Sequence, residues 1–441
     1  MAEVTGDDAA GDGRRAVGDH PGAAPDDAAN MTAAAGETTA ADATEGTGDA
    51  SPAAPDAPDE VVPRGAITTT MVHRGGRGHR EWWRSGVVYE LTAHDLGGAD
   101  LDAVVAGARY ASRLGAHALL IHPGTSPADA PEAAATLLRR TDRLGLRLLV
   151  SVPDGQDRLA VLRHWLEVGA EGVDVGVVPA PDPRAAGRVE DLGAVQALIA
   201  AETEDGILAA ATSAEDPDAL LARLQEVWPH HLRDDRLVRT PWSAPALRRT
   251  ITEAYAQRDP LGAPMVWALH DPVHADGQAV PEPAPLPEHR IRALTLLALA
   301  LPGAVHLRQG EQVGLTDGAA SAGPGAADRA DKVRGRVAEQ AGRPGSTYEM
   351  FRLALRLRSE LGLSTGPLGW VSGLHQAAAE TTVAFVNRQV LVLLNTGEHT
   401  VHLPPTAEVL HASTALLPAP SGGVAVPPSA CVWAQLDQRE R

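Results

Sequence analysis

The chain has 441 residues, 44% of them apolar and only 3% aromatic, and a formal net charge of −19. That length suffices for one large domain and a small second one, and the alanine-rich, aromatic-poor composition favours helices packed on strands. The sequence shows no basic patch, so nucleic acid is not expected as a partner. A single cysteine, Cys431, excludes an intrachain disulfide and predicts a reducing, cytoplasmic location.

Residues 1–63 differ in composition from the rest of the chain. They include no aromatic residue and carry 14 acidic side chains against two arginines, which places −12 of the net charge there. Such a segment cannot bury enough surface to offset its ordering entropy, so we expect a disordered acidic tail. It has no basic stretch followed by an apolar one, so no signal peptide is expected. The longest apolar run of the chain, residues 294–302, is too short to span a membrane, and no membrane association is expected.

Between residues 81 and 365, short apolar runs alternate with segments of helical period, which is typical of βα units. Eight strands are expected, at Val87–Leu91, Ala118–His122, Leu146–Val152, Gly172–Val178, Ile207–Ala211, His231–Arg233, Met265–Leu269 and Ala304–Leu307. Helices are expected between them, including Leu101–Leu114, Asp157–Val168 and Ala244–Ala256. This order predicts an α/β fold, a (β/α)8 TIM barrel over residues 81–365, with a doubly wound open sheet as the alternative.

The region after the eighth strand has a different pattern. Residues 316–345 are rich in Gly and Ala and predict a loop, and a helix is expected over Thr347–Leu361 because Ser346 and Glu349 form a capping box. Over residues 367–438, alternating runs bounded by Gly and Pro predict a small C-terminal antiparallel β domain. Its strands are expected at Thr382–Asn387, Val390–Leu394, Thr400–Leu403, Val409–His411 and Ala430–Leu436.

Four stretches carry a resemblance to a known family. They are EWWRSGVVYEL at 81–91, PWSAPALRRTI at 241–251, HDP at 270–272 and ALALPGAVHLRQGEQVGL at 298–315. In this order they resemble the α-amylase/α-glucosidase family of glycoside hydrolases. The resemblance implies a role in carbohydrate metabolism. The long domain that the family inserts after its third barrel strand is missing, because only a few residues follow that strand here.

The resemblance also implies where catalytic carboxylates should lie. Members of the family are retaining enzymes, which need a nucleophile and an acid/base carboxyl group about 5–5.5 Å apart. By the family pattern, Gly176 occupies the nucleophile position and Ala211 the acid/base position. Asp174 shares a strand face with Gly176 but lies about 7 Å deeper, and Asp271 is the one family carboxylate that remains. The pattern therefore indicates a degenerate member, and no catalytic residue is assigned.

Four polar residues near the expected barrel mouth are candidates for ligand binding, namely His270, Asp271, Asp174 and Asp154. A structural role is the alternative for three of them. Asp271 has the position of a helix N-cap, and His270 that of a satisfied rim histidine. Asp174 needs a partner if it is buried, and Arg147 or His122 is expected to provide it.

Other patterns predict no additional site. Trp82 and Trp83 precede the first barrel strand, so they are expected to pack at the barrel bottom. Glu311 is expected to hold the turn after the eighth strand by a hydrogen bond. HHLRDD at 230–235 lacks a metal-ligand spacing, and RGGRG at 74–78 precedes the first expected strand instead of following one. Neither a metal, a phosphate loop nor a cofactor is therefore expected.

Three functions remain open at this point. The first is a catalytically inactive protein that binds an α-linked saccharide at the barrel mouth, as a saccharide-binding or regulatory pseudoenzyme. The second is an active glycoside hydrolase or transglycosidase in which Asp271 works with Asp154, Asp95 or Glu90. The third is a structural or regulatory protein whose partner is an active paralogue. Fold analogy alone does not choose among them.

Overall fold

A closed barrel of parallel strands forms the larger part of the structure. The computed structural model describes residues 68–76, 81–91, 98–124, 126–152, 158–180, 192–212, 217–270, 286–315, 326–374, 380–419 and 423–436. The barrel strands are β2 (Val87–Leu91), β3 (Ala118–Ile121), β4 (Arg147–Ser151), β5 (Gly172–Val177), β6 (Ile207–Thr212), β7 (His231–Asp234), β8 (Val266–Ala268) and β9 (Ala304–Arg308). Each pairs in parallel with its neighbours, and β2 pairs with β9 to close the ring. The predicted barrel is confirmed, and the open sheet is excluded.

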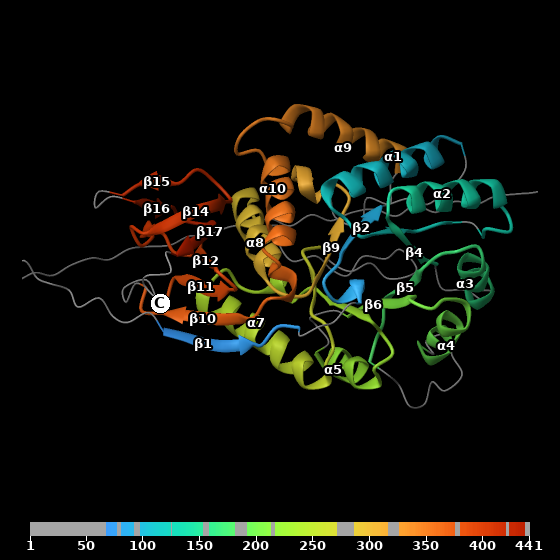
Figure 1. Ribbon diagram of the computed structural model, residues 1–441, viewed down its shortest axis with the longest axis horizontal. Coiled ribbons are helices and arrows are strands. Elements are labelled where there is room, and N and C mark those ends of the chain that lie inside the picture. The colour runs from blue at the N-terminus through green and yellow to red at the C-terminus, as the bar shows by residue number, and fades with distance from the viewer. Residues whose placement is uncertain are drawn as a thin grey trace, which may run out of the picture. The chain divides into compact units, whose positions relative to one another are not determined.

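Helices connect the strands and surround the barrel (Figure 1). They are α1 (Gly98–Leu114), α2 (Pro131–Arg143), α3 (Arg158–Glu167), α4 (Leu192–Glu202), α5 (Pro217–Glu226), α6 (Arg236–Arg239), α7 (Ala244–Arg258) and α8 (Glu288–Ala300). Amphipathic helices turn an apolar stripe inward, as in α2, which buries Ala134, Leu137 and Thr141. The strands are buried on both faces, which explains why they read as continuous apolar runs.

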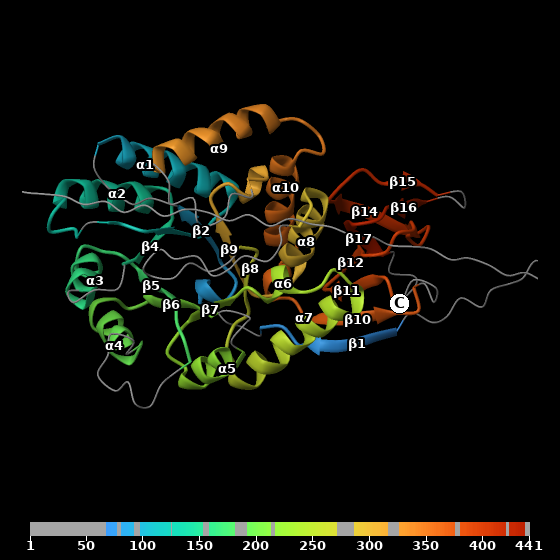
Figure 2. The ribbon, with the colours of Figure 1, turned by 180° about the vertical axis from the view of Figure 1, so that it is seen from behind.

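The helix α8 accounts for the longest apolar run of the sequence. Figure 2 shows it between the barrel and the C-terminal sheet, and its residues Ala293 to Ala300 are all buried. The indole of Trp433 donates to the Leu296 carbonyl at 3.1 Å, and the Asn387 amide donates to the Ala300 carbonyl at 2.8 Å. A helix covered on all sides is hydrophobic all round. None of the helices in the described part of the chain is both long and apolar enough to cross a membrane.

Two antiparallel sheets make up the C-terminal region. Six strands form the larger one, in the order β1 (Thr68–His73), β10 (Leu368–Ser372), β11 (Thr382–Asn387), β12 (Val390–Asn395), β17 (Ala430–Leu436) and β14 (Ala407–Ala412). The smaller contains β13 (Val401–His402), β16 (Val424–Val426) and β15 (Leu417–Pro418). The expected antiparallel region is confirmed. The edge strand β1 was not expected, because its mostly exposed residues show no inward-facing alternation.

The expected loop at 316–345 is wrong in part. Residues Ala326–Gln340 form the helix α9, followed by α10 (Thr347–Glu360). Gly and Ala content suggested a loop, but α9 has one internal glycine, Gly335, and buries Val333. The predicted cap of α10 is half confirmed, because the Ser346 hydroxyl accepts from the Glu349 amide while the Glu349 carboxylate accepts instead from the Gly342 amide at 2.8 Å.

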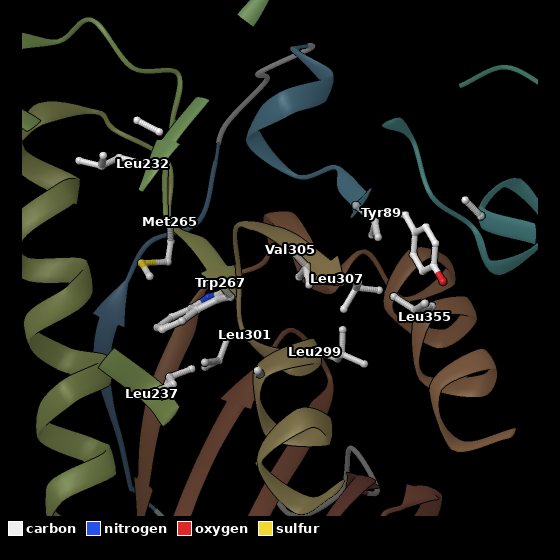
Figure 3. Packing of buried hydrophobic residues seen from close by; sticks show 14 of the residues in the cluster. Tyr89, Leu232, Leu237, Met265, Trp267, Leu299, Leu301, Val305, Leu307 and Leu355 are labelled. Atoms are coloured by element: carbon white, nitrogen blue, oxygen red, sulfur yellow. The ribbon is translucent and has the colours of Figure 1, made fainter. Parts of the chain in front are cut away.

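Barrel strands and outer helices share one apolar core. Figure 3 shows Val305 and Leu307 of β9 close to Leu299 and Leu301 at the end of α8, all of them buried. The indole of Trp267 on β8 donates to the Pro302 carbonyl at 2.9 Å, which ties the strand to the turn after α8. Four short 3-10 helices complete the described elements: η1 (Trp82–Arg84), η2 (Asp259–Leu261), η3 (Glu311–Val313) and η4 (Leu363–Thr365).

Candidate functional site

The carboxyl ends of the barrel strands define the barrel mouth, where (β/α)8 enzymes place their active sites. Alternation along each strand turns every second side chain into the barrel. Below the mouth, this interior is filled by a cluster of ionisable side chains from strands that are distant in sequence. Those described are Glu90, Asp174, His231, Arg233, His306 and Arg308 on the strands, and His122, His270 and Glu311 just beyond them.

Asp174 is buried and bound to Arg233. The Arg233 guanidinium donates to both carboxylate oxygens, with Nη2 3.2 Å from Oδ1, and the Gly176 amide donates to Oδ1 at 2.7 Å. Burial alone would raise the pKa of Asp174, but the charge and hydrogen bonds of Arg233 outweigh it and hold that pKa below its usual value. Asp174 is therefore an ionised, fully engaged carboxylate.

The expected partners of Asp174, Arg147 and His122, are wrong. Asp174 pairs in register with Ser151 at the carboxyl end of β4, whereas Arg147 begins that strand, four residues lower. Arg147 lies over the Trp82 ring, 4.9 Å from its centroid, at the other end of the barrel. His122 instead approaches Glu90 on the neighbouring strand. The true partner comes from β7, which short-range patterns in the sequence do not connect to β5.

A directed chain of hydrogen bonds leads from Arg233 to the barrel bottom. His231 Nε2 lies 2.6 Å from the Trp83 carbonyl, which can only accept, so we assign the proton to Nε2. His231 Nδ1 must then accept from His306 Nε2, 2.9 Å away, and His306 Nδ1 accepts from Arg233 Nη1 at 3.4 Å. Both rings are neutral in this arrangement. Burial lowers the pKa of His231 to about 4, and burial with the Arg233 charge holds the pKa of His306 well below its usual value.

The barrel bottom is closed by apolar packing, as expected for Trp82 and Trp83. Both indoles pack against a buried cluster of Val88, Ala118, Leu120, Leu149 and Ile207 inside the barrel. Within the HHLRDD stretch, His231 and Arg233 lie on β7 and are buried. No group of three metal-binding side chains occurs among the residues that the structure describes.

A second set of charges surrounds Glu90. Its carboxylate lies 2.9 Å from His122 Nε2, 3.4 Å from His270 Nε2 and 4.0 Å from Arg308 Nε. Burial would raise the pKa of Glu90, but the Arg308 charge and the two histidine contacts hold it well below its usual value. Glu90 is therefore ionised and is the central anion of the cluster.

His270 bridges two carboxylates. Its Nδ1 lies 2.8 Å from Glu311 Oε1, while its Nε2 faces Glu90. Since carboxylates accept hydrogen bonds, both ring nitrogens donate and the ring is an imidazolium. Burial and the Arg308 charge would lower the pKa of His270, but the two carboxylates raise it above its usual value. Glu311 Oε2 also accepts from the Arg308 amide at 3.2 Å, which confirms the expected turn-holding hydrogen bond.

The charges of this interior cluster balance. It contains three carboxylates and three cations, namely Glu90, Asp174, Glu311, Arg233, Arg308 and the His270 imidazolium. Such a balanced, hydrogen-bonded set meets the requirement that buried charges be paired.

The two positions implied for the catalytic pair lie beside this cluster and carry no side-chain acid. Gly176 adopts a φ of 72°, where β5 departs from regular pairing with β6 between Asp174 and Val177. Ala211 is fully buried and stands between Val177 of β5 and Arg233 of β7. Asp271, Asp154 and Asp95 lie outside the described residues.

Solved structures with this architecture are numerous, although no family model and no curated protein matches the sequence. An α-amylase from H. orenii superposes with a TM-score of 0.57 at 12% identity, over 80% of this chain and 100% of its own. A family GH13_31 enzyme gives 0.55 at 12%, over 81% and 100%. The acarbose complex of the Geobacillus thermoleovorans α-amylase gives 0.51 at 12%, over 82% and 100%.

The chain has an α-amylase-like fold. Identity at this level establishes the fold alone. Within the α-amylase-like barrel, the sequence identified His270, Asp174 and Glu311 as residues of interest, and the structure brings them into one cluster. It missed Arg233, His306 and Arg308. The available signal was a charged or imidazole side chain at an inward-facing strand position, which is unusual in a buried strand.

Proposed function

We propose that this α-amylase-like chain binds an α-linked saccharide at its barrel mouth and does not hydrolyse it. The observation that carries the proposal is the state of its buried carboxylates. Glu90 and Asp174 are both tied to cations, and both have lowered pKa values. A glycosidase acid must instead hold its proton near neutral pH, which requires a raised pKa. Neither carboxylate fits that role.

The neighbourhood of Gly176 supports the same conclusion. A nucleophile at this position would need a side chain on a backbone with a φ of 72°, a left-handed conformation that favours glycine over most other residues. Among the described residues, the acid beside this position is Asp174, which is held by Arg233 and by the Gly176 amide itself. Both of these interactions would have to break before Asp174 could act in hydrolysis.

His122 supports a binding role. The Glu90 carboxylate contacts His122 Nε2 and fixes the orientation of the ring, and the His122 side chain is 26% exposed. An oriented, partly exposed imidazole offers its second nitrogen to a sugar hydroxyl group. The α-amylase of Geobacillus thermoleovorans, which shares the fold, was solved with acarbose bound. A neutral ligand also suits a mouth whose described charges cancel.

Calorimetric titration with maltose, trehalose and longer α-glucans tests binding. We expect saturable binding by the wild type and, for His122→Ala, a loss of about tenfold in affinity, the usual effect of removing one hydrogen bond to a polar ligand. His399→Ala is the matched control, since that exposed histidine lies in the C-terminal region. If none of these sugars binds detectably, the saccharide-binding part of the proposal is wrong.

Release of nitrophenol from nitrophenyl α-glucosides tests hydrolysis. We expect no release above that of the buffer. Release that disappears in Asp271→Asn would overturn the non-catalytic half and favour an enzyme with relocated carboxylates.

A further inference from the structure

A recess lies at the end of the barrel opposite the mouth. This cleft, with a volume of about 540 Å³, is lined by residues that precede the strands: Ser85 before β2, Met265 before β8 and Gly303 before β9. The end of β1, the end of α7 and the η4 turn complete its walls. Ligand sites typically have volumes of roughly 300–1,000 Å³, so the cleft has room for a small organic molecule.

The exit of β1 forms one rim of this cleft. Arg74, Gly75 and Gly76 line it, and they belong to the RGGRG stretch that the sequence alone placed before any strand. Since β1 ends at His73, the glycines do follow a strand. Gly75 has a φ of 78°, and a Cβ there would lie 2.8 Å from the Thr365 carbonyl oxygen. Glycine therefore lets the backbone close against η4, which fixes the rim.

Positive charge predominates among the described lining residues. Arg74 is exposed on the rim. Arg84 also lines the cleft, held by a 2.8 Å hydrogen bond from Nη1 to the Gly262 carbonyl, and its Nε lies 3.7 Å from a carboxylate oxygen of Glu81. That bond uses one of five guanidinium N–H donors. Asp259 is the one described acid of the lining, and both of its oxygens accept from His73 Nδ1, at 2.8 and 2.9 Å. His73 is further fixed by stacking on the Tyr255 ring.

We propose that this cleft binds the phosphate group of a small organic phosphate ester. Two guanidinium groups from separate segments match phosphate oxygens better than lysines would, because their donors form a planar fork. Ser85 also lines this space, and its hydroxyl group can add a neutral donor. Met265, Pro264 and Val72 supply an apolar wall for the organic part. The site is independent of the saccharide proposal, which concerns the other end of the barrel.

The test is calorimetric titration of the full chain at low ionic strength with inorganic phosphate and with glucose 6-phosphate. We expect both to bind, the ester more tightly because of the apolar wall. Arg74→Gln should weaken both by about tenfold or more, since a hydrogen bond to a charged group is lost. Arg139→Gln is the control, an equal charge change on exposed α2, and should leave both affinities unchanged.

A variant that should strengthen phosphate binding distinguishes an effect of charge from a loss of folding. Asp259→Asn removes the acid from the lining but keeps an oxygen that accepts from His73, so phosphate binding should become several-fold tighter. Loss of folding would weaken binding in every variant and cannot produce this gain. The proposal is overturned if neither phosphate compound binds, if Arg139→Gln weakens binding as much as Arg74→Gln, or if Asp259→Asn fails to strengthen it. Maltose binding should be the same in the wild type and Arg74→Gln, so failure here leaves the mouth proposal intact.

Discussion

Replacement of Asp174 by Asn tests whether this carboxylate is a structural anion or a remnant of a catalytic site. The change keeps the size and shape of the side chain but removes its charge. Asp174 and Arg233 have side-chain exposures of only 2% and 7%, so water cannot compensate the arginine that remains. The variant therefore leaves a buried guanidinium beside the neutral ring of His306.

The expected loss of unfolding free energy is about 3–5 kcal/mol, the usual cost of removing one partner from a buried ion pair. Globular proteins have total stabilities of about 5–15 kcal/mol, so the variant should be close to unfolding. The double variant Asp174→Leu with Arg233→Met should cost less than the single one. It removes both charges and leaves apolar groups, which in buried pairs is often neutral or stabilising.

Urea unfolding followed by circular dichroism measures this loss, with equal m-values showing that the same surface is exposed. The pH dependence gives an independent check. The folded pKa of Asp174 lies below the unfolded value of about 3.9, so its contribution is present above that pH and disappears as pH falls through the folded pKa. The gap between wild type and Asp174→Asn should therefore be constant near neutrality and shrink below about pH 4.

A loss under about 1 kcal/mol at pH 7 would refute this reasoning. It would mean that Arg233 is stable without its partner and that the balanced cluster does not hold the barrel together. A double variant less stable than Asp174→Asn would be equally damaging, since it would show that the charges themselves, and not only their pairing, stabilise the fold.

Three further predictions concern the backbone and the buried histidines. Restoring acids with Gly176→Asp and Ala211→Glu should produce no nitrophenol release. It should cost more than about 1–3 kcal/mol in urea unfolding, because φ at the first position is 72° and the second position is fully buried; measurable release would show that the scaffold is otherwise intact. The pKa of His231 is about 4 in the folded protein and about 6.5 in the unfolded chain, so between these pH values the unfolded chain binds the proton and the folded protein does not. The free energy of unfolding should therefore fall by about 3 kcal/mol as the pH is lowered from about 6.5 to about 4. His231→Gln should reduce this pH dependence, and an unchanged pH dependence would contradict the assignment. Gly303→Ala should cost more than about 3 kcal/mol, because its Cβ would lie 2.3 Å from a carbonyl oxygen, whereas Gly115→Ala, with a φ of 95° against 110° and open space around it, should cost only about 1 kcal/mol by the same unfolding assay.

The barrel could be predicted from the sequence because its strands are buried on both faces. Runs such as Val87–Leu91 and Ile207–Ala211 agree with β2 and β6 to within one residue. The elements that were missed lack this signal. The strand β1 is a mostly exposed edge strand, and α9 is a largely exposed helix whose flanking glycines favour a loop.

The site could be predicted only as a set of positions. Asp174 was expected to need a partner, but Arg233 lies 59 residues further along the chain. His231 and His306 are separated by 75 residues, and His270 and Glu311 by 41. Closure of the barrel creates all three contacts. Local sequence patterns predict that a buried charge requires a partner, but only the folded structure shows which strand provides that partner.

The two ends of the barrel suit different kinds of ligand, and the ionic strength should affect binding at the two ends differently. At the mouth, every described carboxylate faces a cation, so the site offers hydrogen bonds without net charge. At the opposite end, Arg74 and Arg84 outnumber Asp259. Raising the ionic strength from about 0.01 M to about 1 M shortens the Debye length from about 30 Å to about 3 Å, which should sharply weaken phosphate binding and leave maltose binding unchanged. Equal sensitivity of both ligands would mean that salt acts on the protein as a whole and not by screening the attraction between arginine and phosphate, which contradicts the phosphate proposal.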